Sequence, residues 1–182
     1  ASAASDVYKR QHPHRKRALD GDGFVFLLDP TKKFEAQSNA VVEFREELRL
    51  VKGLKVGQAV RLPAAVCVSK LDHETVVDRL KGTSFYEDLA EIDDTGESLD
   101  LAVMEKRSRL MLEFREILWP GWNLDRQIDE LLGGRYLFFP MTPFGLDEMG
   151  KELSDRSALT PFGILAPLLW LLHMSGYPVL PK

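Results

Sequence analysis

The sequence predicts an α/β fold in which a small parallel sheet is covered by helices on both faces. Three short apolar runs, at residues 24–28, 64–68 and 136–139, lack the alternation of polar and apolar residues that a half-exposed strand shows. The segments between and after them repeat apolar residues every three or four positions, as amphipathic helices do. Strands and helices that alternate in this way form three layers with right-handed crossovers.

Length and composition indicate one globular domain. The chain has 182 residues, of which 45% are hydrophobic and 29% are charged. The formal net charge of −4 does not favour a nucleic-acid-binding protein, because no basic stripe is present to neutralise phosphates. No apolar run reaches the ~18 residues that span a bilayer, so we expect no membrane span. Cys67 stands alone in an apolar run, which predicts a buried, inert thiol and a cytoplasmic location.

The first eleven residues are expected to lie outside the fold. Residues 1–11 have no hydrophobic period and resemble a translated cloning adaptor, so they are interpreted as an adaptor-derived or disordered segment. Residues 12–182 are then expected to be the C-terminal part of one domain that belongs to a longer protein.

The first half of this domain contains two predicted strands and one long helix. The run at residues 24–28 ends at Asp29 and Pro30, which turn the chain. Residues 34–50 place apolar side chains at spacings of three and four, which predicts a helix. The run at residues 64–68 leads directly into a polar segment, so the second strand is expected to end there.

The second half is expected to add two helices, the third strand and a final helix. An amphipathic pattern covers residues 99–118, and a shorter one covers residues 123–132 and stops at Gly133, a residue type that favours helix C-termini. The third strand precedes a turn at residues 142–145. The last helix, residues 162–174, is apolar nearly all round, which is typical of a buried helix.

The second strand carries the main binding candidate, because ligands of open parallel sheets bind at the carboxyl ends of the strands. Lys70 and Asp72 follow this strand and lie two residues apart, so in extended backbone their side chains point to the same side. The Asp72 carboxylate can accept two hydrogen bonds from the ring N–H and the exocyclic amine of guanine, whereas adenine presents an acceptor there. The Lys70 stem can cover a face of the base. An ordinary solvated Lys/Asp turn is the alternative.

The other strand ends carry further candidates. Asp29 is either a metal-binding acid beside a nucleotide or an aspartate at a strand-to-loop turn. Thr142, after the third strand, either helps to bring backbone N–H groups toward the purine oxygen or caps a helix. His73 is expected to cap the next helix and His173 to pack in the core. Neither histidine has a second ligand at metal spacing, so no metal site is predicted.

These three strand ends, in this order, resemble the second half of a small-GTPase-like G domain. Residues 24–29 look like the central strand after the switch region, residues 64–72 like the strand with the guanine-specificity motif NKxD or TKxD, and residues 136–145 like the strand that ends in the SAxG-type guanine loop. The Pro-Leu-Leu-Trp-Leu-Leu run at residues 167–172 is similar to the last helix of bacterial double-GTPase-type proteins. The resemblance implies a three-layer P-loop NTPase-like fold whose N-terminal half is truncated here.

The resemblance also implies roles for the site residues. Lys70 would stack on the base, Asp72 would read it, and Thr142 would stand in for the loop serine. Ser69 replaces the usual asparagine or threonine and keeps a hydroxyl, while Pro143 replaces an alanine whose backbone N–H would contact the guanine oxygen. No Gly-x-x-x-x-Gly-Lys-Ser/Thr loop occurs in the chain, so phosphate and magnesium binding are expected from an upstream part of the intact protein.

The function implied by the resemblance is that of a bacterial GTPase-like switch. It would bind GTP or GDP, with magnesium in the intact protein, and work with an unidentified protein partner. GTP hydrolysis fits the intact protein but not this chain alone, and the first strand is expected to expose a long apolar edge without its upstream neighbour. Two alternatives stay open: a nucleotide-free interaction module that docks through the apolar tail near Trp170, and a P-loop ATPase with Asp29 at the metal.

Overall fold

The computed structural model describes residues 21–93, 100–142 and 162–180. Three strands and seven helices occur in these segments. They follow one another in the order β1 (Phe24–Leu28), α2 (Phe34–Lys52), β2 (Ala64–Val68), α3 (Glu74–Leu80), α4 (Phe85–Asp93), α5 (Leu101–Glu113), α6 (Arg115–Leu118), α7 (Leu124–Leu132), β3 (Tyr136–Pro140) and α8 (Ala166–Met174).

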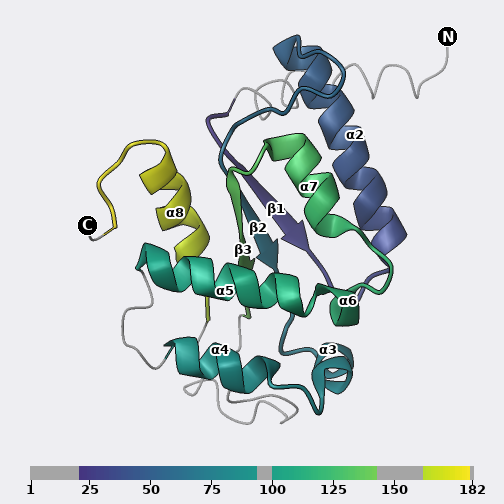
Figure 1. Cartoon of the computed structure of the whole chain (residues 1–182), viewed down its shortest axis with the longest axis vertical. Helices are drawn as coiled ribbons and strands as arrows, with labels where there is room; N and C mark the ends of the chain where they lie inside the picture. The colour runs from purple at the N-terminus through teal and green to yellow at the C-terminus, as the bar shows by residue number, and fades with distance from the viewer. Residues whose placement is uncertain (1–20, 94–99, 143–161, 181–182) are drawn as a thin grey trace, which may run out of the picture.

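The three strands form one parallel sheet in which β2 is central (Figure 1). The register aligns Phe24 with Ala64 and Ala64 with Tyr136, so the strands begin and end at the same level. Every residue of β2 is buried, as a central strand covered on both faces requires. The predicted α/β class and the three predicted strands are confirmed, and the third strand continues one residue further, to Pro140.

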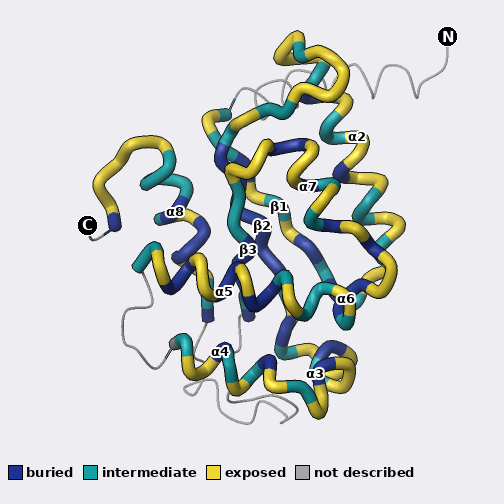
Figure 2. Tube along the Cα trace, viewed as in Figure 1, coloured by how far each residue is buried: buried dark blue, intermediate teal, exposed yellow. Residues whose placement is uncertain are grey.

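Helices pack on both faces of the sheet. One face, which includes Phe24, Val66 and Phe138, shares a hydrophobic core with α2 and α7. On the other face, α8 places Trp170 against Phe139 with ring centroids 5.9 Å apart. Figure 2 shows that buried residues follow the sheet and the inner sides of the helices around it.

The β1 strand is buried on one face only, so the prediction of cover on both faces is wrong for this strand. Phe24 and Leu28 are buried, whereas Val25 is 59% exposed and Leu27 is 66% exposed. Side chains alternate between the two faces of a strand, which puts the exposed pair on the face opposite α2. On that face α8 packs over β2 and β3 and leaves β1 uncovered.

The pattern at residues 99–118 forms two helices instead of one. The backbone of Phe114 leaves the helical region, with φ −95° and ψ 4°, and separates α5 from α6. The Phe114 ring packs edge-on against Phe85 of α4, with centroids 5.2 Å apart. Two further helices, α3 and α4, lie between β2 and α5. The predicted stop of α7 is confirmed, because Gly133 has left-handed backbone there.

The last helix is shorter and more exposed than predicted. It begins at Ala166, since Phe162 pairs with another segment before the helix starts. Leu168 is 55% exposed while Trp170 is 3% exposed, so only one side of α8 is buried. His173 is half-buried and does not lie in the core as predicted. Each helix in the described segments is too short or too polar to cross a membrane.

Candidate functional site

The carboxyl ends of the three strands bring the predicted site residues to one end of the sheet. Asp29 directly follows β1, Ser69 directly follows β2, and Thr142 lies two residues beyond β3. The strands are parallel and in register, so these positions lie at the same level. A hydrogen bond of 2.8 Å from the Met141 N–H to the Val68 carbonyl extends the pairing of β2 and β3 toward Thr142.

Asp29 anchors the loop that follows β1. Its Oδ2 accepts a hydrogen bond from Lys70 Nζ at 2.7 Å, and its Oδ1 accepts from the Thr31 backbone N–H at 2.9 Å and from the Thr31 hydroxyl at 2.6 Å. The Gln37 side chain of α2 accepts from the Asp29 N–H at 2.7 Å and donates to the Asp29 carbonyl at 3.1 Å. Both carboxylate oxygens are engaged, which favours the strand-to-loop aspartate over the metal-binding acid.

The charge of Asp29 follows from these contacts. Partial burial acts to raise the pKa of Asp29, but the hydrogen bonds from Lys70 and Thr31 and the positive charge of Lys70 outweigh it. The pKa of Asp29 therefore lies below its usual value. A negative Asp29 at neutral pH holds the Lys70 ammonium group in place.

The backbone turns sharply at Lys70. This residue has a left-handed φ of 57°, and its carbonyl accepts a hydrogen bond from the His73 N–H at 3.0 Å, which closes a four-residue turn. The prediction that Lys70 and Asp72 share one side of an extended backbone is therefore wrong, because a turn replaces the extended chain. Lys70 instead reaches across the end of the sheet to Asp29, and its side chain stays 48% exposed.

Ser69 and His73, which flank the turn, hold it in place. Ser69 donates both its N–H and its hydroxyl to the Leu28 carbonyl, each at 2.9 Å. His73 Nδ1 accepts a hydrogen bond from the Thr75 N–H at 3.2 Å, which confirms that His73 caps the following helix. The Ser69 hydroxyl thus ties the ends of β1 and β2 together.

Asp72 has surroundings of a different kind. Its Oδ2 atom is buried and has no hydrogen-bond partner among the described residues. Tyr86 of α4 lies close by: burial, and then the charge of Asp72, raise the pKa of Tyr86 above its usual value. The Tyr86 hydroxyl donates to the Leu71 carbonyl at 2.8 Å and not to Asp72. A buried carboxylate oxygen without a donor costs stability, and a ligand with N–H groups would satisfy it.

Thr142 is buried and pairs with the segment before α8. Its N–H donates to the Phe162 carbonyl at 3.2 Å, and its carbonyl accepts from the Phe162 N–H at 2.9 Å. The next residue, Gly163, passes so close to β3 that a Cβ atom there would lie 2.1 Å from the Pro140 carbonyl oxygen. This approach requires glycine. Pro143, the other predicted residue of this loop, lies outside the described residues.

Four residues that the sequence analysis did not single out contribute to this end of the sheet. Gln37 holds the loop after β1, Tyr86 lies beside Asp72, and Phe162 pairs with the chain after β3. Arg107 of α5 is buried, and its guanidinium lies 4.9 Å from the centre of the Phe162 ring. These residues lie in helices or loops whose sequence patterns predict secondary structure but do not indicate a role in binding.

The chemistry available at the site is that of hydrogen-bond recognition. In the described segments, no group of three or more His, Cys, Asp and Glu side chains is arranged to hold a metal ion. Cys67 is buried as predicted, and burial raises the pKa of its thiol to about 12, so the thiol is protonated at neutral pH. Of the two carboxylates at the strand ends, Asp29 is engaged by Lys70 and Thr31, which leaves Asp72 as the acceptor without a donor among the described residues.

Comparison with known proteins returned no match: no protein-family model, curated protein or solved structure is similar to the chain.

Proposed function

We propose that the strand-end site binds a guanine nucleotide through its base, as the base-recognition half of a GTPase-like switch protein. The observation that carries this proposal is the buried Asp72 Oδ2 atom, which lacks a hydrogen-bond partner among the described residues. Guanine has two neighbouring donors, its ring N–H and its exocyclic amine, and these match the two oxygens of one carboxylate. Adenine has an acceptor at the corresponding ring nitrogen, so it would leave the charge of Asp72 unsatisfied.

Lys70 supports the base in this proposal. Its ammonium group is bound by Asp29 at 2.7 Å, and its side chain is 48% exposed. A bound ammonium group restricts the alkyl stem, which can then cover one face of a flat base. Asp29 is the positioning residue for Lys70, and Ser69 holds the ends of β1 and β2 in register.

No glycine-rich phosphate loop occurs in the sequence. In this proposal, the phosphates would therefore be held by a loop from further polypeptide. An upstream strand with such a loop would pair with the outer edge of β1, which has no strand partner among the described residues, near Asp29 and Lys70. Magnesium binding, GTP hydrolysis and contact with a protein partner would then belong to the intact protein. This chain alone would recognise the base.

A nucleotide-free interaction module is the second candidate. It is favoured by the Thr142 N–H, which is bonded to Phe162 and does not face a purine oxygen. Trp170 itself is 3% exposed and packs against Phe139, so the docking surface of such a module would be formed by exposed neighbours in the same tail, such as Leu165 and Leu168, which are 62% and 55% exposed. The P-loop ATPase interpretation has less support, since both carboxylate oxygens of Asp29 are already bonded.

Ligand-observed NMR with the full chain separates these candidates. Base recognition predicts saturation transfer to guanosine and to GDP with similar dissociation constants, because the chain has no loop to hold the phosphates. Adenosine should give no transfer. No signal from either nucleoside would contradict the proposal and favour the interaction module. Equal signals from guanosine and adenosine would contradict selection of the base by Asp72.

A further inference from the structure

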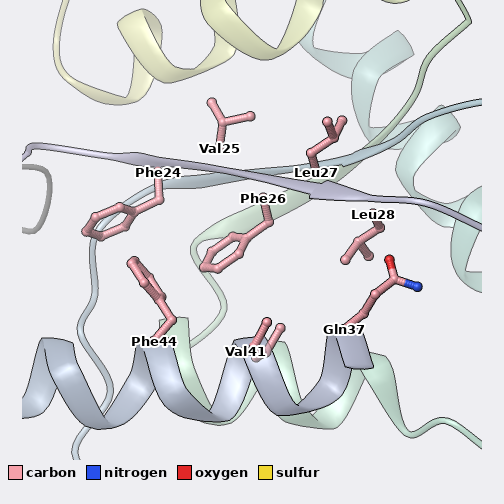
Figure 3. Close-up of a pocket in the computed structure, with 9 residues that line it drawn as sticks. Phe24, Val25, Phe26, Leu27, Leu28, Gln37, Val41 and Phe44 are labelled. Atoms are coloured by element: carbon pink, nitrogen blue, oxygen red, sulfur yellow. The ribbon is translucent and has the colours of Figure 1, made fainter. Parts of the chain in front are cut away.

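An open cavity lies at the start of α2, and we call it the α2 cavity. It has a volume of about 540 Å³ and is lined by the first residues of α2, by α3, and by α6 with the residues that follow α6 (Figure 1). This volume is within the range of small-molecule sites. The α2 cavity shares no lining residue with the apolar groove of about 440 Å³ between β1 and the side of α2 (Figure 3).

Positive side chains outnumber negative ones in the α2 cavity. Lys32, Lys33 and Arg79 line it, and Glu35 is the one acidic residue in this lining. No carboxylate among the described residues forms an ion pair with either lysine or with Arg79. Arg79 Nη1 donates to two backbone carbonyls, at 2.8 and 3.2 Å, which leaves the other N–H groups of this guanidinium for a ligand. The lining therefore carries two positive charges in excess.

The first turn of α2 adds backbone donors to the same place. The first N–H groups of a helix have no partner within the helix, and the helix dipole makes this end attractive to an anion. Helix α2 has 19 residues, and its N-cap residue, Lys33, makes no side-chain hydrogen bond to these groups. The start of α2 thus offers N–H donors next to three cationic side chains.

A buried donor in the α2 cavity lacks an acceptor. Trp119 lines the cavity and is 3% exposed, and its indole Nε1 atom has no hydrogen-bond partner among the described residues. Buried donors in folded proteins are nearly always satisfied, because an unsatisfied one costs stability. An acceptor that entered the cavity beside the indole ring would satisfy this N–H group.

We propose that the α2 cavity binds a small phosphate monoester. A phosphate monoester carries close to two negative charges at neutral pH and has three strong acceptor oxygens. The charge matches the excess positive charge of the lining, and the oxygens match the side-chain donors, the first turn of α2 and the Trp119 indole. The organic group of the ligand would lie against the apolar side chains of Phe34 and Ile117.

This proposal does not rest on base recognition at the strand ends. Asp29, Lys70 and Asp72 do not line the α2 cavity, so a base at Asp72 and a phosphate monoester in the cavity would contact different side chains. Asp72→Asn should therefore leave the dissociation constant of the monoester unchanged. Loss of monoester binding in this variant would overturn the assignment of a separate site.

The indole N–H signals of the full chain, in proton–nitrogen NMR spectra, test the location of binding. The chain has three tryptophans, and the Trp119→Phe variant identifies the signal of Trp119. At constant ionic strength, phenyl phosphate should shift this signal saturably and leave that of Trp170, on the opposite face of the sheet, unchanged. Inorganic phosphate should bind more weakly, because it has no group for the apolar wall. A Trp119 signal that does not move, equal shifts of both signals, or equal affinity for the two ligands would overturn the proposal.

Charge variants test the role of the lining. Lys32→Gln and Lys33→Gln in one chain should raise the dissociation constant of phenyl phosphate by roughly fivefold or more. Glu35→Gln should lower the constant, because it removes the negative charge that repels the ligand. Lys52→Gln, in the last turn of the same helix, is the matched control and should leave the constant unchanged. Equal effects of the lysine pair and of Lys52, or weaker binding by Glu35→Gln, would contradict a phosphate site at the start of α2.

Discussion

Two aspartates at the same end of the sheet have opposite surroundings. Asp29 accepts hydrogen bonds from Lys70 and Thr31 with both carboxylate oxygens. Asp72 has a buried oxygen without a partner among the described residues. A bonded carboxylate contributes to folding stability, whereas a buried carboxylate oxygen without a donor costs stability. At the scale of residues, Asp29 therefore belongs to the framework and Asp72 to the proposed recognition site.

The Asp29–Lys70 ion pair makes stability depend on pH in a defined direction. Asp29→Asn should lower the free energy of unfolding by about 1 kcal/mol at neutral pH, because Lys70 loses its charged partner. The pKa of Asp29 is lowered from 3.8 in the fold, so this contribution is present above that value and is lost as the pH falls through the folded pKa. Urea unfolding of both proteins at neutral pH and at about pH 3 measures the difference. A difference that does not shrink in acid would contradict the ion pair.

At the scale of elements, apolar runs predict the strands well because each run is bounded by turn residues. The bounds of β1 and β2 agree with the predicted ones. The break between α5 and α6 was not predicted, because it depends on packing of Phe114 against Phe85, which is distant in sequence. The turn at Lys70 is also absent from the prediction, because a lysine with positive φ gives no sequence signal as strong as that of a glycine. The order of the strand ends predicts which residues lie together at this end of the sheet, but not the bonds that occupy Asp29 and Thr142.

One hydroxyl group of α5, that of Ser108, is bonded to the edge of β3. Ser108→Ala removes the acceptor of the Phe138 N–H, a buried donor, and should lower the free energy of unfolding by about 1–3 kcal/mol. Ser175→Ala removes an exposed hydroxyl that donates to the Leu171 carbonyl, and should change the free energy of unfolding by less than about 0.5 kcal/mol. Urea unfolding measures both variants. Equal effects would indicate that α5 covers β3 without help from this hydrogen bond.

At the scale of the whole molecule, the two edge strands of the sheet, β1 and β3, have different neighbours. Helix α5 closes the β3 edge, while β1 has no strand partner on its outer side among the described residues and exposes Val25 and Leu27. In the part of the chain that the structure describes, the outer edge of β1 is therefore apolar, as predicted. The proposed base recognition at Asp72 would lie at the end of the central strand and would need no contribution from that edge.

Recognition of guanine by Asp72 is tested most directly by exchange of the base. Asp72→Asn keeps the shape of the side chain but replaces an acceptor with a donor, so the variant should lose guanosine and gain xanthosine, whose carbonyl stands where guanine has its amine. Asp78→Asn, at an exposed position on α3, is the control and should keep the wild-type preference. Ligand-observed titrations of the three proteins with both nucleosides give the ratio of dissociation constants. We predict that the ratio reverses in Asp72→Asn alone, by more than about tenfold; an unchanged ratio in that variant would contradict the role of Asp72.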